Sequence, residues 1–184
     1  MVEEEPVSWW REQPRRSAAD VTTVVLHATE TPDLAAARLA AENGARVCGH
    51  LYIDRDGSVH AFVPLDRVAW HVRGHNTSSI GIELVNRGRY PRHFDSRSQT
   101  PTEEFPAAQI SALKTVLREL RAAFPELRYL VRHSDLDREE VPADDDPRHR
   151  VRRRIDPGPL FPWAEVKAFW DQISDASASG SRPT

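Results

Sequence analysis

Apolar runs along the chain predict buried strands. Five of the six residues at positions 21–26 are β-branched, which is typical of a buried strand, and the run ends at His27. Further apolar runs predict strands at residues 80–85 and 127–132, and the second of these is followed directly by His133. Two of the predicted strands therefore end at a histidine.

A hairpin and three helices complete the pattern. Residues 50–63 read as two strands around Asp56-Gly57, because this pair tolerates the positive φ of a tight turn. Apolar residues recur with the helical period in three stretches, which are residues 34–43, closed by Asn43-Gly44, residues 107–123, and a last helix that contains Trp163, Val166, Phe169 and Trp170. Strands interleaved with helices predict an α/β fold, a single domain with a central mixed β-sheet flanked by helices.

Three other segments lack apolar periodicity. Residues 1–20 are polar apart from one tryptophan pair, and they predict an N-terminal arm that packs on the domain. Residues 135–154 divide into an acidic and a basic half and predict a solvated loop. Residues 174–184 are mainly Ser, Ala, Gly and Pro, which is typical of a disordered tail. The main domain is therefore expected to span residues 21–173.

Composition narrows the classes of function. A chain of 184 residues with 39% hydrophobic and 29% charged residues fits one domain, and its single cysteine, Cys48, excludes an intrachain disulfide and cysteine-rich zinc modules. The net charge of -3 gives no basic surface for nucleic acid. No apolar run is long enough for a membrane span, and the acidic residues 3–5 are unlike an export signal. A monomer in the cytoplasm, with neither nucleic acid nor membrane as a partner, is the default expectation.

His27 and His133 are candidate metal ligands. Ligands collect at the carboxyl ends of strands in open α/β sheets, so the two imidazoles face one crevice if their strands are neighbours. Asp156 lies in a rigid Asp-Pro-Gly-Pro turn before the last helix and offers a carboxylate. Two histidines, one carboxylate and a water form an open zinc site. The residues alone support a structural role for these three side chains about equally well.

Six segments, in order along the chain, carry a resemblance to a known family. They are residues 24–29 (Val-Val-Leu-His-Ala-Thr), 50–57 (His-Leu-Tyr-Ile-Asp-Arg-Asp-Gly), 69–76 (Ala-Trp-His-Val-Arg-Gly-His-Asn), 79–86 (Ser-Ile-Gly-Ile-Glu-Leu-Val-Asn), 131–135 (Val-Arg-His-Ser-Asp) and 154–163 (Arg-Ile-Asp-Pro-Gly-Pro-Leu-Phe-Pro-Trp). Over about residues 21 to 171 the chain resembles the zinc-dependent N-acetylmuramoyl-L-alanine amidases of type 2. This superfamily includes phage amidase lysins, muropeptide-recycling amidases and peptidoglycan recognition proteins. Single segments such as the hairpin are weak, but six in this order are highly specific.

The resemblance implies roles for the main site residues. His27, His133 and Asp156 match the zinc ligands of the family. Glu83 matches the acidic residue that acts as general base, although the sequence without the resemblance supports a solvated strand face almost as well. Arg154 stands where many relatives have a lysine that stabilises the oxyanion, and arginine keeps the positive charge.

Other residues match the family's cleft or fall outside its pattern. The positions implied to bind substrate are His50, Trp70, His71, His75 and Asn76. For His71 and His75 a structural role is equally well supported. The three histidines that match no position of the family, and are expected at the surface, are His60, His93 and His149.

The function that the resemblance implies is hydrolysis of the amide bond between N-acetylmuramic acid and L-alanine, in peptidoglycan or a muropeptide, with bound Zn²⁺. The intact ligand set favours this over a non-hydrolytic peptidoglycan-binding recognition module, because such relatives lose a zinc ligand. A phage lysin or an effector has the same chemistry and differs in delivery. Two departures from the family are Arg132 in place of a usual glycine and a longer charged loop at 135–153, which is either a lid or a solvated insertion.

Overall fold

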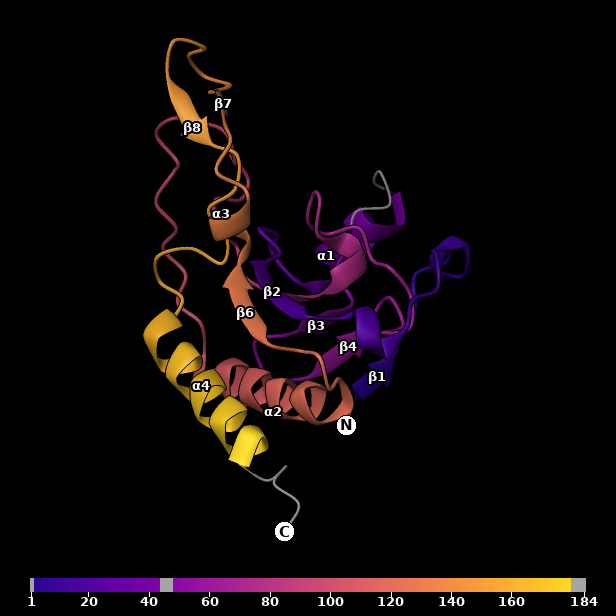
Figure 1. Ribbon diagram of the computed structural model, residues 1–184. Coiled ribbons are helices and arrows are strands. Elements are labelled where there is room, and N and C mark those ends of the chain that lie inside the picture. The colour runs from indigo at the N-terminus through magenta and orange to yellow at the C-terminus, as the bar shows by residue number, and fades with distance from the viewer. Residues whose placement is uncertain (1, 44–47, 180–184) are drawn as a thin grey trace.

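A mixed β-sheet forms the centre of the computed structural model, which describes residues 2–43 and 48–179 (Figure 1). The helices and strands are, in chain order, β1 (Val2–Glu4), β2 (Thr23–Ala28), α1 (Leu34–Asn43), β3 (Leu51–Ile53), β4 (Val59–Ala61), β5 (Ser79–Leu84), α2 (Ala107–Ala123), β6 (Tyr129–Arg132), α3 (His133–Leu136), β7 (Glu140–Pro142), β8 (Arg150–Arg152) and α4 (Trp163–Ser179). Short 3₁₀ helices lie at Trp10–Glu12, Ala18–Asp20 and Asn76–Ser78. The sheet has the order β1-β4-β3-β5-β2-β6, and its neighbours are parallel except for the β3–β4 hairpin. The predicted α/β fold with a central mixed sheet is confirmed.

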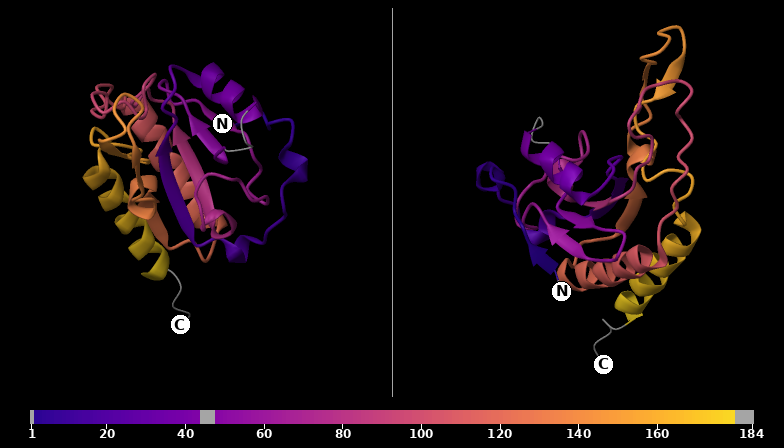
Figure 2. Two further views of the ribbon diagram at one scale, coloured as in Figure 1. Left: turned by 90° about the horizontal axis from the view of Figure 1, so that it is seen from above. Right: turned by 180° about the vertical axis from the view of Figure 1, so that it is seen from behind.

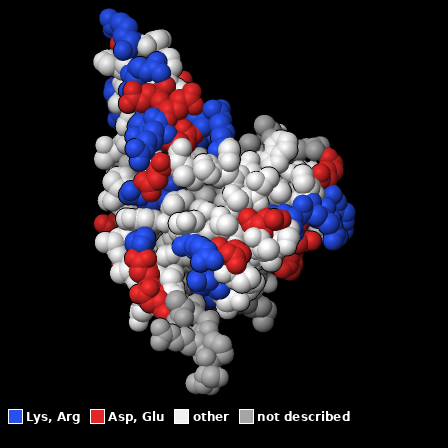
Figure 3. All heavy atoms as spheres, viewed as in Figure 1, with Lys and Arg blue, Asp and Glu red and all other residues white. Residues whose placement is uncertain are grey.

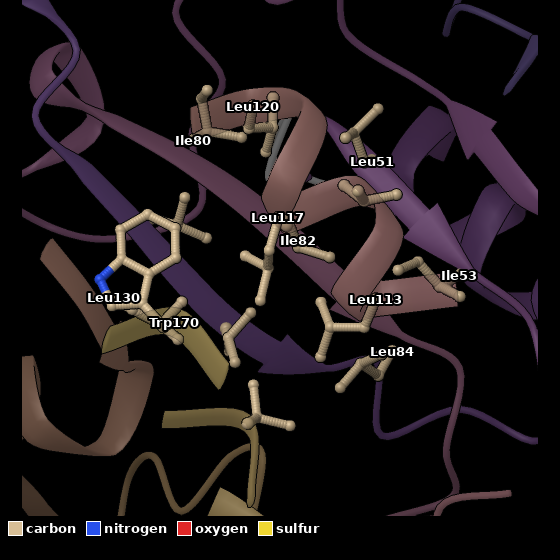
Figure 4. Close-up of a cluster of buried hydrophobic side chains, with 14 of the residues drawn as sticks. Leu51, Ile53, Ile80, Ile82, Leu84, Leu113, Leu117, Leu120, Leu130 and Trp170 are labelled. Atoms are coloured by element: carbon tan, nitrogen blue, oxygen red, sulfur yellow. The ribbon is translucent and has the colours of Figure 1, made fainter. Parts of the chain in front are cut away.

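One face of the sheet carries the larger hydrophobic core, and a smaller buried cluster that includes residues of α1 packs on the opposite face. In β5, Ile80, Ile82 and Leu84 are buried in the core that α2 and α4 complete, and Figure 4 shows them in one cluster with Leu117 of α2 and Trp170 of α4. Truncation of a fully buried side chain such as Leu117 to alanine costs about 2–5 kcal/mol. The intervening residues of β5 face the side on which α1 lies, because successive strand side chains alternate (Figure 1).

The strands and helices expected from periodicity are present, and apart from the C-terminal end of α4 their ends are shifted by at most two residues. α2 has the predicted bounds, and its buried stripe of leucines packs against the sheet. The glycine expected to stop α1, Gly44, lies outside the described residues. Local periodicity was sufficient for these elements because each has one face in the core.

The N-terminal segment contributes a strand to the sheet. β1 lies at the edge and pairs in parallel with β4, with Val2 opposite Val59. The segment is fixed further along by Trp9, which is buried and donates its indole N–H to the carbonyl of Ala41 at 3.0 Å. β1 is only three residues long and two of them are glutamates, so its sequence does not predict a strand. Its pairing depends on the unpaired backbone edge that β4 offers.

The C-terminal helix is longer than the sequence analysis predicts. α4 runs to Ser179, so the disorder expected for residues 174–179 is wrong, and residues 180–184 lie outside the described part. Trp170 anchors α4 in the core, and each further residue then adds one backbone hydrogen bond to the helix. The alanine and serine residues of this segment do not end the helix. Within the described residues, no helix is both long and apolar enough to cross a membrane.

Residues 135–154 are not a simple solvated loop. They contain α3 and the antiparallel β7–β8 hairpin, which projects from the body of the molecule (Figures 1 and 2). The hairpin is fixed to the segment before α2: Asp144 donates its amide to the carbonyl of Phe94 at 2.9 Å, and Ser96 donates to Asp145. Figure 3 shows acidic and basic atoms alternating along this projection. Arg150 donates across the hairpin to the carbonyl of Glu140, and Arg153 pairs with Glu139 just outside the two strands.

Candidate active site

Three side chains from separate parts of the chain converge at one edge of the sheet. β2 lies between β5 and β6 and runs parallel to both, so His27 near the end of β2 and His133 directly after β6 meet. Asp156 enters from the segment between β8 and α4. The Nδ1 atoms of the two histidines are 3.0 Å apart, and the Oδ2 atom of Asp156 is 3.1 Å from that of His27 and 3.0 Å from that of His133. The expected adjacency of the two strand-end histidines is confirmed.

The geometry and protonation of this group fit a metal ion. All three residues are buried, and the second carboxylate oxygen of Asp156, Oδ1, has no hydrogen-bond partner among the described residues. Burial lowers the pKa of His27 to about 4, so its imidazole is neutral at pH 7. Burial opposes ionisation of Asp156, but its close contacts with the ring nitrogens of His133 and His27 outweigh burial and hold the pKa of Asp156 below its usual range. Two imidazoles and a carboxylate are the donor set of an open zinc site.

A chain of hydrogen bonds turns the correct atom of His27 towards this point. The hydroxyl of Ser79 donates to the carbonyl of His75 at 2.7 Å, so its oxygen accepts from Nε2–H of His71 at 3.1 Å. Nδ1 of His71 is then an acceptor, and His27 donates Nε2–H to it at 2.9 Å. The lone pair of His27 is therefore on Nδ1, which faces His133 and Asp156.

Gly81 makes room for this chain. A Cβ atom at Gly81 would lie 2.5 Å from Cγ of His71, so no other residue fits while the ring of His71 lies on the strand. The sequence carried a signal for this contact, because a glycine inside an apolar strand often marks a close approach. Gly81 and Ser79 were nevertheless not among the predicted site residues.

Glu83 and Arg154 place opposite charges beside the three donors. Glu83 is the register partner of His27 on β5, its side chain is 14% exposed, and its Oε1 is 4.0 Å from Nδ1 of His27. Burial, aided by the negative charge of Asp156 and opposed by Arg154, raises the pKa of Glu83 to about 8. Arg154 is partly buried, and its Nε has no hydrogen-bond partner among the described residues. A carboxyl that exchanges its proton near neutral pH thus lies beside a cation with unused donor capacity.

These groups open into a cleft of about 360 Å³. Its lining consists of the five residues already described, His71, and residues of β2, β3, α1 and the loops beyond the strand ends: Ala28, Thr29, Glu30, Thr31, Ala37, Ala40, Ala41, Tyr52, His93 and Phe94. The sequence analysis expected His93 at the surface, but this residue is partly buried, and its Nε2 lies 2.9 Å from the carbonyl oxygen of Glu30. One wall therefore comes from the segment on which the hairpin is docked.

Comparison with known sequences places the chain in a family. The family model described as N-acetylmuramoyl-L-alanine amidase matches residues 17–159. The chain belongs to this amidase family. Among relatives, it is 32% identical over 133 residues to the 1,6-anhydro-N-acetylmuramyl-L-alanine amidase AmpD of Escherichia coli (67% of this chain, 58% of the relative) and 35% identical over 96 residues to the endolysin of Enterobacteria phage K11 (52% and 58%). The chain thus spans about 58% of the length of these curated relatives.

The fold of the amidase family is also found among solved structures. The E. coli amidase AmiD, in complex with anhydro-N-acetylmuramic acid-L-Ala-D-γ-Glu-L-Lys, superposes with a TM-score of 0.64 at 25% identity, covering 86% of this chain and 61% of that chain. The resemblance drawn from the six sequence segments is therefore confirmed at the level of family and fold.

The amidase cleft does not include every residue expected to bind substrate. Trp70 is 46% exposed and lies with Asn76 at a neighbouring hollow that Arg154 also lines. His75 is exposed and lines neither hollow. His50 is wrong as a substrate contact, because its side chain is fully buried and accepts the amide N–H of Gly81 at 3.0 Å.

Two further histidines differ in their setting. His71 lines the cleft but is buried and orients His27, so its structural role is the one that the hydrogen bonds favour. His149 is exposed as expected, whereas His60 is buried against β1 and the surface expectation for it is wrong. Asn76 accepts the amides of His71 and Val72, which shapes the turn that carries the His71 ring.

The sequence analysis missed a buried ion pair at the edge of the amidase cleft. Arg89 donates two hydrogen bonds to the carboxylate of Glu30, one from Nε at 2.7 Å and one from a terminal nitrogen at 2.9 Å. The backbone of Glu30 has a φ of 50°. Arg89 also donates to the carbonyls of Arg152 and Arg153. The pair joins the end of β2 to the backbone just before Arg154. No periodic pattern marks such a long-range contact.

Proposed function

We propose that the chain is a zinc-dependent hydrolase that cleaves the amide bond between N-acetylmuramic acid and L-alanine in peptidoglycan or muropeptides. The observation that carries the proposal is the convergence of Nδ1 of His27, Nδ1 of His133 and Oδ2 of Asp156 within 3.1 Å of one another, beside Glu83. Membership of the amidase family and the names of AmpD and AmiD support the reaction and the substrate class.

The residues of the cleft have separate roles in the proposed reaction. When bound, a zinc ion supplies Lewis-acid chemistry, which activates water near neutral pH and polarises the amide carbonyl. The carboxylate of Glu83 takes a proton from the attacking water and returns it to the departing amine of L-alanine, as the C–N bond breaks and a C–O bond forms. The guanidinium of Arg154 faces the cleft and stabilises the negative charge that develops on the carbonyl oxygen.

The reaction is tested with a panel of defined muropeptides, in anhydro and reducing forms, and with intact peptidoglycan. The expected products, identified by mass spectrometry, are a free peptide that begins with L-alanine and the lactyl-bearing sugar. A panel also ranks polymeric wall against small muropeptides. Binding of the same compounds without release of peptide would instead support the alternative, a recognition module without turnover.

Metal content tests the ligand assignment separately. The purified protein is expected to carry zinc at this site, and His133→Ala is expected to lose it because the two remaining donors no longer enclose an ion. Metal analysis and the retained fold, measured by circular dichroism, check the result. His149→Ala is the matched control, since this histidine is exposed on the hairpin side. Full zinc occupancy in His133→Ala would exclude His133 as a ligand.

A further inference from the structure

A second group of possible metal ligands lies away from the cleft, where β1 joins the edge of the sheet. Glu3 is opposite His60 in the β1–β4 register, and Glu5 follows two residues later on the same face of the strand. Nδ1 of His60 is 3.5 Å from Oε2 of Glu3 and 3.6 Å from Oε2 of Glu5, and the three donor atoms lie within 4.8 Å of one another. None of these residues lines the catalytic cleft.

The imidazole of His60 is fixed so that its lone pair faces the two carboxylates. The hydroxyl of Ser58 donates to Oδ1 of Asp56 at 2.7 Å, so the Ser58 oxygen accepts from Nε2–H of His60 at 3.0 Å. The neutral ring then has its lone pair on Nδ1. This arrangement repeats the serine-to-histidine chain that orients the metal-facing nitrogen of His27.

Nothing in the described part of the chain satisfies this nitrogen. The side chain of His60 is only 8% exposed, and its Nδ1 has no hydrogen-bond partner. Distances of 3.5 and 3.6 Å exceed those of a charge-assisted N–H···O bond, about 2.7–2.9 Å, so a proton on Nδ1 is poorly placed for either carboxylate. The lone pair on Nδ1 and the two carboxylates repel one another, and a cation bound between these three donors would replace the repulsion with attraction.

The local charge also favours a cation. Arg38 lies 3.5 Å from Oε2 of Glu5 and offsets one negative charge, while Glu3 makes no such contact with it. One imidazole with two carboxylates suits a first-row divalent ion such as zinc or cobalt, whereas Ca²⁺ and Mg²⁺ prefer oxygen donors alone.

We propose that Glu3, Glu5 and His60 form a second metal site, which binds a divalent transition-metal ion of the zinc class and clamps β1 to β4. The site is independent of the proposed amidase reaction. β1 is held at the edge of the sheet by only three residue pairs, all with β4, so a bridging ion adds a cross-strand link to this short pairing. Its role is to hold the N-terminal segment in the sheet.

The experiment is a titration of untagged protein that already holds one equivalent of zinc. Co²⁺ is the probe, because it binds more weakly than zinc and leaves the zinc in the cleft, while its visible absorption reports its ligands. The wild type is expected to bind about one equivalent of Co²⁺ without releasing zinc. Glu3→Gln and His60→Gln are expected to lose this binding. Glu3 is exposed, so its variant tests the site even if His60→Gln fails to fold.

Two control variants are matched to these changes. Glu4→Gln removes the same charge from the neighbouring residue of β1, which lies on the other face of the strand. His149→Gln removes an exposed histidine whose Nδ1 lies 3.4 Å from a carboxylate oxygen of Asp146. Both are expected to retain Co²⁺ binding.

Hydrogen exchange provides the test of the clamp: Co²⁺ should slow exchange of the Glu5 amide, which donates to Ala61, in the wild type and not in Glu3→Gln.

The proposal is overturned if the zinc-loaded wild type binds no Co²⁺, if Co²⁺ uptake is matched by zinc release, or if Glu3→Gln and Glu4→Gln bind it equally. Unchanged exchange at Glu5 would reject the clamp. These outcomes are independent of muropeptide cleavage, because the readouts are Co²⁺ absorption, metal content and amide exchange.

Discussion

Glu83 is the residue whose surroundings most directly suggest proton transfer. It is mostly buried beside His27, and burial raises its pKa to about 8. We expect Glu83→Gln to keep its fold and its zinc but to lose at least about a hundredfold in the rate of muropeptide cleavage, since the amide has nearly the same shape and accepts no proton. Product release by mass spectrometry, metal analysis and circular dichroism check the three parts. Near-normal turnover would reduce Glu83 to a structural residue.

Arg154 is expected to act on the charge that develops during the reaction. Arg154→Ala should lower kcat by a factor equivalent to about 2.7–4 kcal/mol with zinc content unchanged, which is the scale of a lost oxyanion donor. Arg154→Lys should recover much of this loss because it retains the positive charge. Steady-state kinetics on a defined muropeptide measure both.

The structure also selects the control for this series. Arg152 donates to the carbonyls of Ser134 and Asp137, and Arg153 is paired with Asp137, so neither is simply a solvated cation as the sequence suggests. Arg148 is exposed, and among the described residues its side chain bonds to Asp146 alone, so Arg148→Ala is the better comparison. Equal losses in Arg154→Ala and Arg148→Ala would remove Arg154 from the catalytic group.

At the scale of elements, the ion pair of Glu30 and Arg89 connects β2, the segment before α2 and the hairpin. Removing one partner of a buried pair leaves an uncompensated charge, so Arg89→Met should lower the free energy of unfolding by about 3–5 kcal/mol. The double variant with Glu30→Gln should be more stable than Arg89→Met alone, because the buried charge is gone. Urea unfolding measures both. A loss under about 1 kcal/mol in Arg89→Met would contradict the clamping role.

At the scale of the whole molecule, the cleft makes stability depend on pH when metal is absent. The pKa of Glu83 rises from 4.5 to about 8 on folding, so between these values the folded state binds more protons than the unfolded state. The contribution of Glu83 to stability is therefore lost as pH rises through this window. In chelator, the wild type should lose on the order of a few kcal/mol relative to Glu83→Gln between about pH 5 and pH 8.

Urea unfolding of the two metal-free proteins at several pH values tests this expectation. Glu83→Gln is its own control, because every other titrating group is shared. Zinc should flatten the difference, since a nearby cation favours the ionised carboxylate. Parallel stability profiles for the two proteins would mean that Glu83 is solvated in the folded state.

Local patterns account for the part of the fold that the sequence predicts. The stripe of α2 and the alternation of β5 depend on neighbours two to four positions apart, which any single sequence displays. β1, the β7–β8 hairpin and the end of α4 were missed, because their formation depends on pairing with β4, on docking to the segment at Phe94, and on an anchored helix. These are contacts with distant partners that leave no local period.

The sequence by itself determined the family and indicated the type of chemistry that we propose. Two histidines at strand ends, an aspartate in a rigid turn and the order of six segments already indicated the zinc amidase family. Only the tertiary structure decided which atoms meet: His27 and His133 are 106 positions apart, and the pairing of β2 with β6 brings their Nδ1 atoms to 3.0 Å. It also assigned His71 to orienting His27 and His60 to a separate group with β1. The reason is physical, because hydrogen bonds and burial depend on distances in space, whereas sequence patterns record only distances along the chain.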